Sequence, residues 1–245
     1  MKIDIKTVIL FIGYGRSGHS VIANILNSHP NILISDEIGI IKENLKSKTA
    51  IINRIINHGK KHPPRYNSIN KVEYKEFNIP KTTINVIGDK HANQNTKYIS
   101  RNFNLFENFR VNSPNLKLIH VIRNPYDIIT TKFIRRKNIR WKGSLNKTIN
   151  EFNVLASTVK KLKQNNSVLD IKLEELIYHP EENISMLFDY VGVKYNEELV
   201  KNLSGILLKK PSVTRNKLNW SKNQITTVQN IINIYDWLKG YEYGN

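Results

Sequence analysis

The chain has 245 residues, enough for one domain with a substantial core, and its 38 basic and 20 acidic residues give a formal net charge of +18. It contains no cysteine, which excludes a disulfide framework and a thiolate metal site. A positive field of this size favours anionic ligands, although an excess of solvated surface lysine gives the same total. Because no apolar run approaches 18 residues, we expect a cytoplasmic protein without a signal peptide or membrane span.

Short apolar runs predict five strands, at residues 8–12, 32–34, 84–87, 116–122 and 168–171. Helical patterns follow at residues 20–26, 38–56, 127–140, 145–162, 181–190 and 223–238. Strands that alternate with helices predict an α/β fold, a P-loop-like three-layer sandwich with a mostly parallel sheet between helices. We expect one domain over residues 1–245, with a helical and loop insertion at about 42–82 that contains the basic loop 59–65. This insertion either lies near the site or is a surface insertion without a role in it.

The first candidate site is the glycine-rich turn that joins the first predicted strand to the first helix. Backbone N–H groups at such a helix N-terminus suit a phosphate. Gly13, Gly15 and Gly18 match the dinucleotide fingerprint, with Asp36 as its acidic residue. Residues 13–20 also match a P-loop, but His19 replaces the lysine, which argues against an ordinary ATPase or kinase. The turn alone leaves both templates open, together with a turn that binds no ligand.

A second set of candidate ligands follows the fourth predicted strand. Arg123 comes directly after residues 116–122, at the carboxyl end of the strand, where open α/β sheets bind ligands. Thr131 and Arg135 are four positions apart on the next helix and therefore share one face. Because a guanidinium group meets phosphate oxygens bidentately, these side chains predict a compact anion clamp.

In order and spacing, these motifs resemble the sulfotransferases that use 3′-phosphoadenosine 5′-phosphosulfate (PAPS), in particular the bacterial and tyrosylprotein branch. Residues 16–20 resemble the 5′-phosphosulfate loop, and Arg123 with Thr131 eight positions later resembles the 3′-phosphate motif. Arg135 stands where the tyrosylprotein branch has a further phosphate-binding arginine. The Asn-Ser-His-Pro stretch at 27–30 and similarities near 173–192 and 220–242 extend the resemblance over residues 7–37, 84–135 and 168–242.

The resemblance implies transfer of a sulfuryl group from PAPS to a hydroxyl or amine, implies no metal, and assigns roles to individual residues. The implied ligands of the 5′-phosphosulfate are Gly15, Arg16, Ser17, Gly18, His19 and Ser20. The implied ligands of the 3′-phosphate are Arg123, Thr131 and Arg135, with Arg215 and Lys217 closing over it. Glu37, seven residues after Pro30, is the preferred general base, and His91 is the alternative. Arg16 neutralises charge on the leaving phosphate, and Lys90 assists at the sulfuryl group.

The chain departs from the family pattern at four places. His19 stands where a threonine is usual, and Leu173 replaces the usual tyrosine. The late basic element, Arg215-Asn216-Lys217, lacks its glycine, and Ala92 occupies the position of the catalytic histidine of cytosolic members. These departures concern contacts within the site, whereas the order of the motifs along the chain is kept.

Two other classes of function stay open at this point: an NAD(P)-binding Rossmann oxidoreductase that uses residues 13–18, and a non-catalytic basic module that binds polyanions. The sequence contains no zinc-finger spacing, RNA-binding strand motif or basic zipper, so we expect no nucleic-acid partner. As acceptor we expect a carbohydrate or small molecule, and the charge and the basic segment 57–66 favour an anionic glycan.

Overall fold

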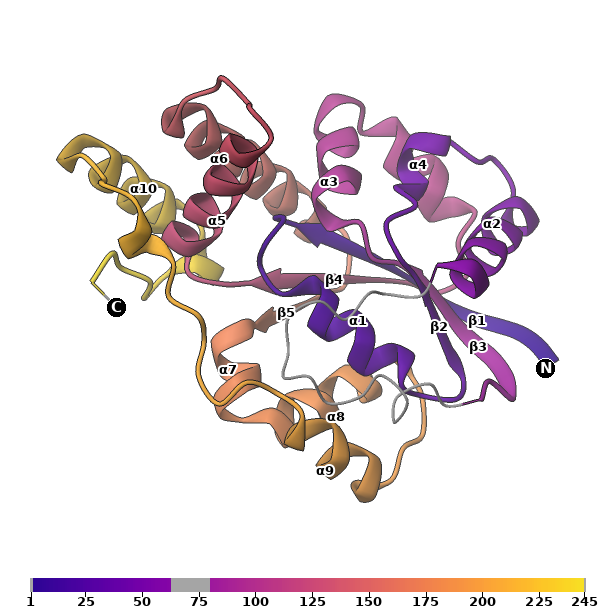
Figure 1. Cartoon of the computed structure of the whole chain (residues 1–245). Helices are drawn as coiled ribbons and strands as arrows, with labels where there is room; N and C mark the ends of the chain where they lie inside the picture. The colour runs from indigo at the N-terminus through magenta and orange to yellow at the C-terminus, as the bar shows by residue number, and fades with distance from the viewer. Residues whose placement is uncertain (1, 63–79, 245) are drawn as a thin grey trace.

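The computed structural model describes residues 2–62 and 80–244. Its centre is a five-stranded sheet in the order β2-β3-β1-β4-β5, in which every neighbouring pair is parallel (Figure 1). The strands are β1 (Lys2–Gly13), β2 (Ile32–Ser35), β3 (Thr83–Asp89), β4 (Leu116–Ile122) and β5 (Val168–Lys172). All five predicted strands are therefore confirmed, and β1 extends the predicted run toward the N-terminus.

The apolar runs have a simple cause, because the sheet is covered on both faces. In β1, Ile9 and Phe11 are buried in the core on one face, while Val8, Leu10 and Ile12 are buried in the core on the other. Side chains alternate between the faces of a strand, so a strand buried on both faces reads as one continuous apolar run.

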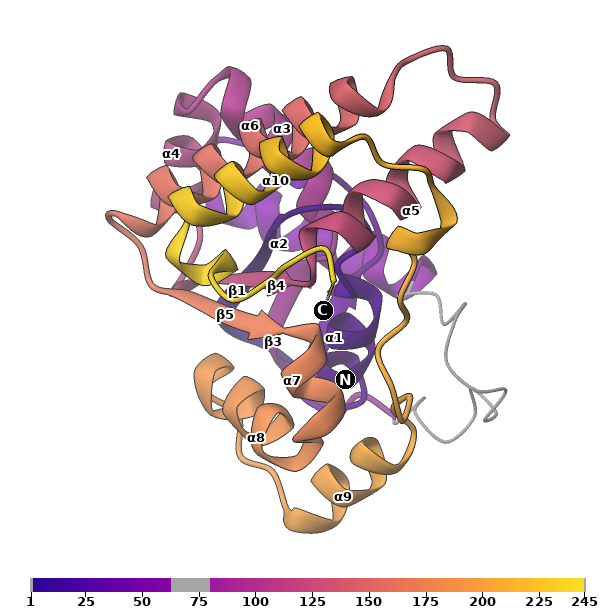
Figure 2. The ribbon, with the colours of Figure 1, turned by 90° about the vertical axis from the view of Figure 1, so that its left-hand side faces the viewer.

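Helices form the two outer layers, as Figures 1 and 2 show. One face of the sheet carries α1 (His19–Asn27), α7 (Leu173–Tyr178), α8 (Pro180–Val191) and α9 (Glu197–Gly205). The other carries α2 (Lys48–Lys61), α3 (Ala92–Arg101), α4 (Asn104–Val111) and α6 (Leu145–Lys163). Beside these, α5 (Pro125–Asn138) and α10 (Lys222–Ile234) pack with α6 in a third apolar cluster. The predicted three-layer α/β fold is confirmed.

The expected helix at 38–56 is wrong, because the chain forms two helices there. A 3₁₀ turn, Ile40–Glu43, ends at Asn44, whose φ of 48° breaks the helix, and Ser47 then caps α2 by accepting a hydrogen bond from the Ala50 amide (3.2 Å). α2 buries Ile51 and Ile55 against the sheet, so residues 48–61 belong to the core. The expected basic loop begins inside α2, and its residues 63–65 lie outside the described part of the chain.

The strand order argues against the dinucleotide-binding alternative. In that fold the second strand lies directly beside the first, so its terminal acidic residue reaches the bound ribose. Here β3 lies between β1 and β2, and Asp36 forms an ion pair with Lys90 instead. None of the helices within residues 2–62 and 80–244 has the length and hydropathy needed to cross a membrane.

Candidate active site

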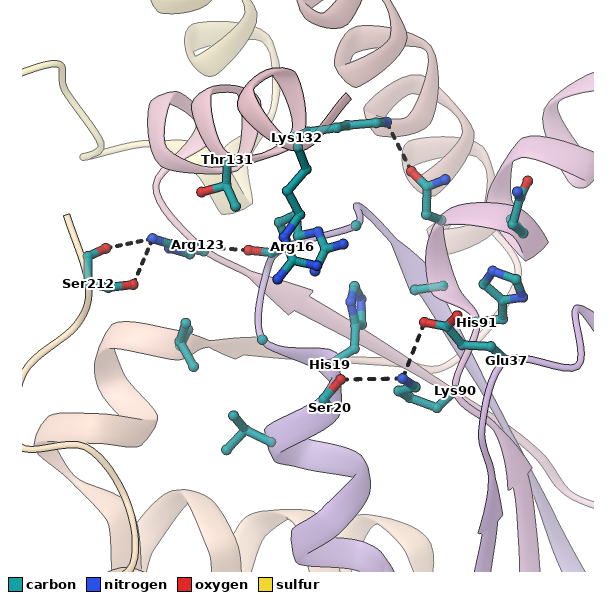
Figure 3. A pocket seen from close by; sticks show the side chains of 18 of the residues that line it. Arg16, His19, Ser20, Glu37, Lys90, His91, Arg123, Thr131, Lys132 and Ser212 are labelled. Carbon is teal, nitrogen blue, oxygen red and sulfur yellow. Dashed lines mark hydrogen bonds and ion pairs between the residues drawn. The ribbon is translucent and has the colours of Figure 1, made fainter. Parts of the chain in front are cut away.

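A cavity of about 1010 Å³ opens at the carboxyl edge of the sheet (Figure 3). Each strand contributes to it through the residues that directly follow the strand or come soon after it. Gly15 and Arg16 follow β1, Glu37 follows β2, Lys90 and His91 follow β3, Arg123 follows β4 and Leu173 follows β5. This is the edge at which parallel α/β sheets bind ligands, so the motifs found in the sequence converge on one space.

The glycine turn presents the N-terminus of α1 to this cavity. Gly18 is the N-cap residue with a φ of 108°, and a Cβ at this position would lie 2.8 Å from Leu173 Cδ1, so only glycine fits. The first backbone bond of the helix runs from the Val21 amide to the Gly18 carbonyl (2.9 Å). Since α1 has neither a side-chain cap nor an acidic residue in its first turn, its N-terminal partial charge is available to an anion.

His19 and Ser17 support the turn from inside. Ser17 is buried, its hydroxyl donates to the Tyr14 carbonyl (3.0 Å), and its oxygen lies 3.2 Å from His19 Nδ1. Burial lowers the pKa of His19 to about 3, so the imidazole is neutral at physiological pH and adds no charge. His19 lines the cavity, whereas the Ser17 side chain does not.

Lys90 links the turn to the proposed base. Its side chain is only 6% exposed and forms ion pairs with Asp36 and with Glu37 Oε1, the latter at 3.4 Å. The same ammonium lies 3.3 Å from Ser20 Oγ. The Glu37 side chain is 61% exposed and lines the cavity, so a carboxylate, an ammonium and a hydroxyl form one connected set (Figure 3).

The loop that carries Glu37 is held by Asp89, the last residue of β3. Asp89 Oδ1 accepts a hydrogen bond from the Ile38 amide (3.0 Å), and Oδ2 accepts from the amides of Gly39 (3.0 Å) and Ile40 (2.9 Å). Glu37 itself has a φ of 54°, a conformation that a non-glycine residue keeps only when its surroundings impose it. Asp89 therefore fixes the backbone of the loop that carries Glu37.

Arg123 forms the second cationic part of the site. Its side chain is 5% exposed; Nη1 donates to the Arg16 carbonyl (3.1 Å), and Nη2 donates to the carbonyl oxygen and Oγ of Ser212, the latter at 3.0 Å. Thr131, on α5, lines the same part of the cavity, and its hydroxyl lies 3.0 Å from Thr214 Oγ1. Burial lowers the pKa of Arg123, which reflects the cost of holding its charge there.

The charge of the cavity is poorly neutralised. Arg16, Arg123 and Arg135 all line it, and none of the three forms an ion pair with a carboxylate in residues 2–62 or 80–244. Burial and the neighbouring Arg135 both lower the pKa of Arg16. Arg123 is buried, whereas Arg16 and Arg135 are exposed. A cluster of cations without carboxylate partners favours an anionic ligand that supplies the missing charge.

Arg215 and Lys217 do not line the cavity. Arg215 is buried, and its Nη1 forms an ion pair with Asp127 Oδ2 (2.7 Å). The amides of Thr214 and Arg215 both donate to Asp127 Oδ1, at 2.6 and 2.7 Å. This arrangement anchors the segment that carries Ser212, so Arg215 acts on the site through the backbone. Lys217 is exposed to solvent.

Several residues of the cavity were not predicted. Polar side chains come from α3 and α5 and from the segment before Arg215, and they are Asn93, Gln94, Lys132, Arg136, Asn138 and Ser212. Apolar side chains line it as well, among them Val21, Ile177, Leu207 and Leu208. Within the described residues, no group of three or more histidine or acidic side chains is arranged to hold a metal.

The fold and the cavity define a P-loop-like α/β protein with a cationic cavity at the carboxyl edge of its sheet. The family model described as "Sulfotransferase family" matches residues 9–197, and the chain therefore belongs to the sulfotransferase family. It is accordingly an enzyme that transfers a sulfuryl group. None of the curated proteins matches the chain significantly.

Solved structures agree in fold. The sulfotransferase domain of the olefin synthase from Synechococcus PCC 7002 has a TM-score of 0.58 at 13% identity, covering 96% of this chain and 97% of that one. The sulfotransferase domain from the curacin biosynthetic pathway has a TM-score of 0.56 at 15% identity, covering 96% and 99%. Retinol dehydratase, solved with retinol and the desulfated donor PAP, has a TM-score of 0.50 at 12% identity, covering 96% and 84%.

Proposed function

We propose that the cavity binds PAPS with the 5′-phosphosulfate on the turn before α1 and the 3′-phosphate on Arg123. The observation that carries this proposal is the set of three arginines, Arg16, Arg123 and Arg135, which line one cavity without an acidic partner in the described residues. They accompany a helix N-terminus without a side-chain cap. The presence of PAP in the retinol dehydratase structure supports the choice of donor.

At the 5′ end, we assign the phosphate to the backbone amides of residues 17–20 and to the Ser20 hydroxyl. Lys90 Nζ, 3.3 Å from Ser20 Oγ, then faces the sulfuryl group. The Arg16 guanidinium neutralises the charge that develops on the bridging oxygen as its bond to sulfur breaks. His19 contributes shape and no charge, because its imidazole is neutral.

At the 3′ end, we assign the phosphate to Arg123, Thr131 and Arg135. Arg123 is preorganised by the Arg16 carbonyl and by Ser212, so its guanidinium need not be ordered on binding. Arg215 and Lys217 lie outside this set, and we assign Arg215 to the anchoring of Ser212 and Thr214 through Asp127. The apolar side chains Leu207 and Leu208 border the space between the two phosphate sites.

We assign the general base to Glu37. Its carboxylate takes the proton of the acceptor hydroxyl or amine while the acceptor oxygen or nitrogen bonds to sulfur, and the electron pair of the broken S–O bond stays on the departing phosphate. Lys90 and Arg16 stabilise the negative charge that moves in this step. His91 also lines the cavity and is the alternative base.

Two variants distinguish the two bases. We expect Glu37→Gln to retain the affinity for PAP and to lose at least 100-fold in kcat, since general base catalysis contributes about 10²–10⁴-fold. His91→Ala is expected to keep most of the turnover. A loss of turnover in His91→Ala with normal turnover in Glu37→Gln would transfer the role to His91.

For the acceptor, we propose a carbohydrate or another polar small molecule that presents a hydroxyl or amine. The half of the cavity beyond the donor is lined by amide and cationic side chains, among them Asn93, Gln94 and Lys132. Hydroxyl groups of a sugar find both donors and acceptors on such a surface.

Thermal unfolding with PAP, ATP and NAD tests the donor. A ligand at 100 times its Kd stabilises the folded state by about 2.7 kcal/mol. We expect PAP to raise Tm well above either alternative at equal concentration. Preference for NAD would support an oxidoreductase, and an equal response to all polyanions that moderate salt abolishes would support a non-catalytic binding module.

A further inference from the structure

The cavity continues past the donor half, over the first turn of α3 and the second half of α5. This part is lined by Asn93, Gln94, Lys132, Arg136, Asn138 and Ile139. It adjoins the glycine turn, because a Cβ placed on Gly15 would lie 3.5 Å from Asn93 Cβ. None of these side chains is among those that we assign to the donor, so we consider their chemistry with respect to the acceptor.

Lys132 and Arg136 give this part of the cavity an excess of positive charge. Lys132 Nζ and Arg136 Nη2 both contact the same oxygen, Glu151 Oε2, at 3.1 and 2.7 Å. One carboxylate thus neutralises two cations, and Arg136 Nη1 is buried without a hydrogen-bond partner in the described residues. The side chains are only 13% and 23% exposed, so water screens this charge incompletely.

Both cations are held in place before any ligand arrives. Lys132 Nζ donates a hydrogen bond to Asn93 Oδ1 (3.0 Å), which ties α5 to α3 across the cavity (Figure 3). The Arg136 guanidinium lies 4.8 Å from the ring centroid of Trp141, a distance at which a cation interacts with an aromatic face. Cations held in this way form a site of defined geometry, and a solvated patch of lysines does not.

The remaining lining is hydrophilic. Asn93, Gln94 and Asn138 offer amide donors and acceptors, and Ile139 is the apolar member of this group. Such a surface matches a molecule with many hydroxyl groups, whereas a steroid or a phenol would leave the amides without partners.

We infer that Lys132 and Arg136 form a subsite for a carboxylate on a saccharide acceptor, and that Asn93 and Gln94 hold neighbouring hydroxyls of the same molecule. The inference rests on the proposed function, because it takes Glu37 and the donor half as the reacting centre. A carboxylate suits the subsite because two fixed cations share one carboxylate partner, which leaves a net positive charge beside the cavity. The negatively charged sugar then completes the neutralisation that Glu151 leaves unfinished.

The test measures sulfuryl transfer from radiolabelled PAPS to uronate-containing oligosaccharides from heparosan, chondroitin and alginate, and to the same oligosaccharides after carboxyl reduction. We expect the carboxylated forms to have a KM at least 10-fold below that of their reduced counterparts. Lys132→Met and Arg136→Met should raise the KM for the carboxylated acceptor about 10-fold and leave the KM for the reduced acceptor unchanged. PAP affinity should stay at the parent value in both variants.

Lys137→Met is the matched control, because Lys137 is exposed on the same helix, does not line the cavity and contacts the Phe133 ring instead. Lys137→Met removes the same charge and should leave the KM for the carboxylated acceptor at the parent value. If the KM depended only on the net charge of the protein, it would rise equally in this control. Equal KM for carboxylated and reduced acceptors, or an equal effect of all three substitutions, would overturn the inference.

Other outcomes separate the inference from the proposed function. Preferred transfer to an acidic tyrosine peptide or to 4-nitrophenol, or transfer to none of the saccharides by a protein that binds PAP, would overturn the acceptor class and leave the donor assignment intact. Failure of the parent protein to bind PAP would instead contradict the proposed function itself.

Discussion

Arg123→Ala tests the 3′-phosphate site most quantitatively. Arg123 is 5% exposed and lines the cavity. Its Nη1 donates to the Arg16 carbonyl, and its Nη2 donates to Ser212 Oγ. A hydrogen bond to a charged group is worth about 1.5–3 kcal/mol. Two such bonds to the 3′-phosphate correspond to a loss of about 3 kcal/mol, or roughly 100-fold in the Kd for PAP.

The assay is calorimetric titration of parent and variant with PAP and with 5′-AMP, which lacks the 3′-phosphate. We expect the 100-fold loss with PAP and less than a threefold change with 5′-AMP. Arg101→Ala, an exposed arginine at the end of α3 that does not line the cavity, serves as the control for net charge. Equal losses for the two nucleotides would refute the assignment, because the effect would then not depend on the 3′-phosphate.

Three further predictions concern the base, the turn and the anchored segment. In a single-turnover measurement with bound PAPS, Glu37→Gln should lose at least 100-fold in rate at unchanged PAP affinity, and a normal rate would exclude Glu37 as the base. Because burial lowers the pKa of His19 to about 3 from 6.5, the unfolded state binds the additional proton below about pH 6.5, so His19 makes folding less favourable as the pH falls. His19→Thr should therefore gain stability relative to the parent between pH 6.5 and 4 in denaturant titrations, and a pH-independent difference would contradict a neutral buried imidazole. Asp127→Asn leaves the buried Arg215 without its ion-pair partner and should cost about 3–5 kcal/mol of unfolding free energy. Adding Arg215→Met to this variant should recover part of the lost unfolding free energy, because the unpaired buried charge is removed. If the losses of the two single variants simply add in the double variant, Arg215 and Asp127 are not energetically coupled.

The strands could be predicted because the sheet is buried on both faces, so that each strand is an uninterrupted apolar run. The helix α3 could not, because it buries Asn95 and Thr96 together with Ala92 and Ile99, and polar residues on the buried face hide the helical period. Burial of these polar side chains is possible because each has a partner: Asn95 donates to Asp89, and Thr96 accepts from the Gly13 amide. Such partners lie far away in the sequence and leave no local signal.

The same reasoning explains which site residues were found. Arg16, Arg123 and Glu37 lie directly after strands, so their convergence at one edge of the sheet follows from a parallel topology. Arg215 is held by Asp127, which lies 88 positions earlier in the sequence. From the sequence alone Arg215 was predicted to bind phosphate, because this long-range contact leaves no local signal. Ser212 lines the cavity for the same reason, because its segment is held by that anchor.

The most direct measurement is a crystal structure of the protein grown with PAP. The account predicts the 5′-phosphate at the amides of residues 17–20 and the 3′-phosphate within hydrogen-bond distance of Arg123 and Thr131. A nucleotide bound elsewhere, or one bound in the cavity with its 3′-phosphate directed away from Arg123 and Thr131, would contradict it.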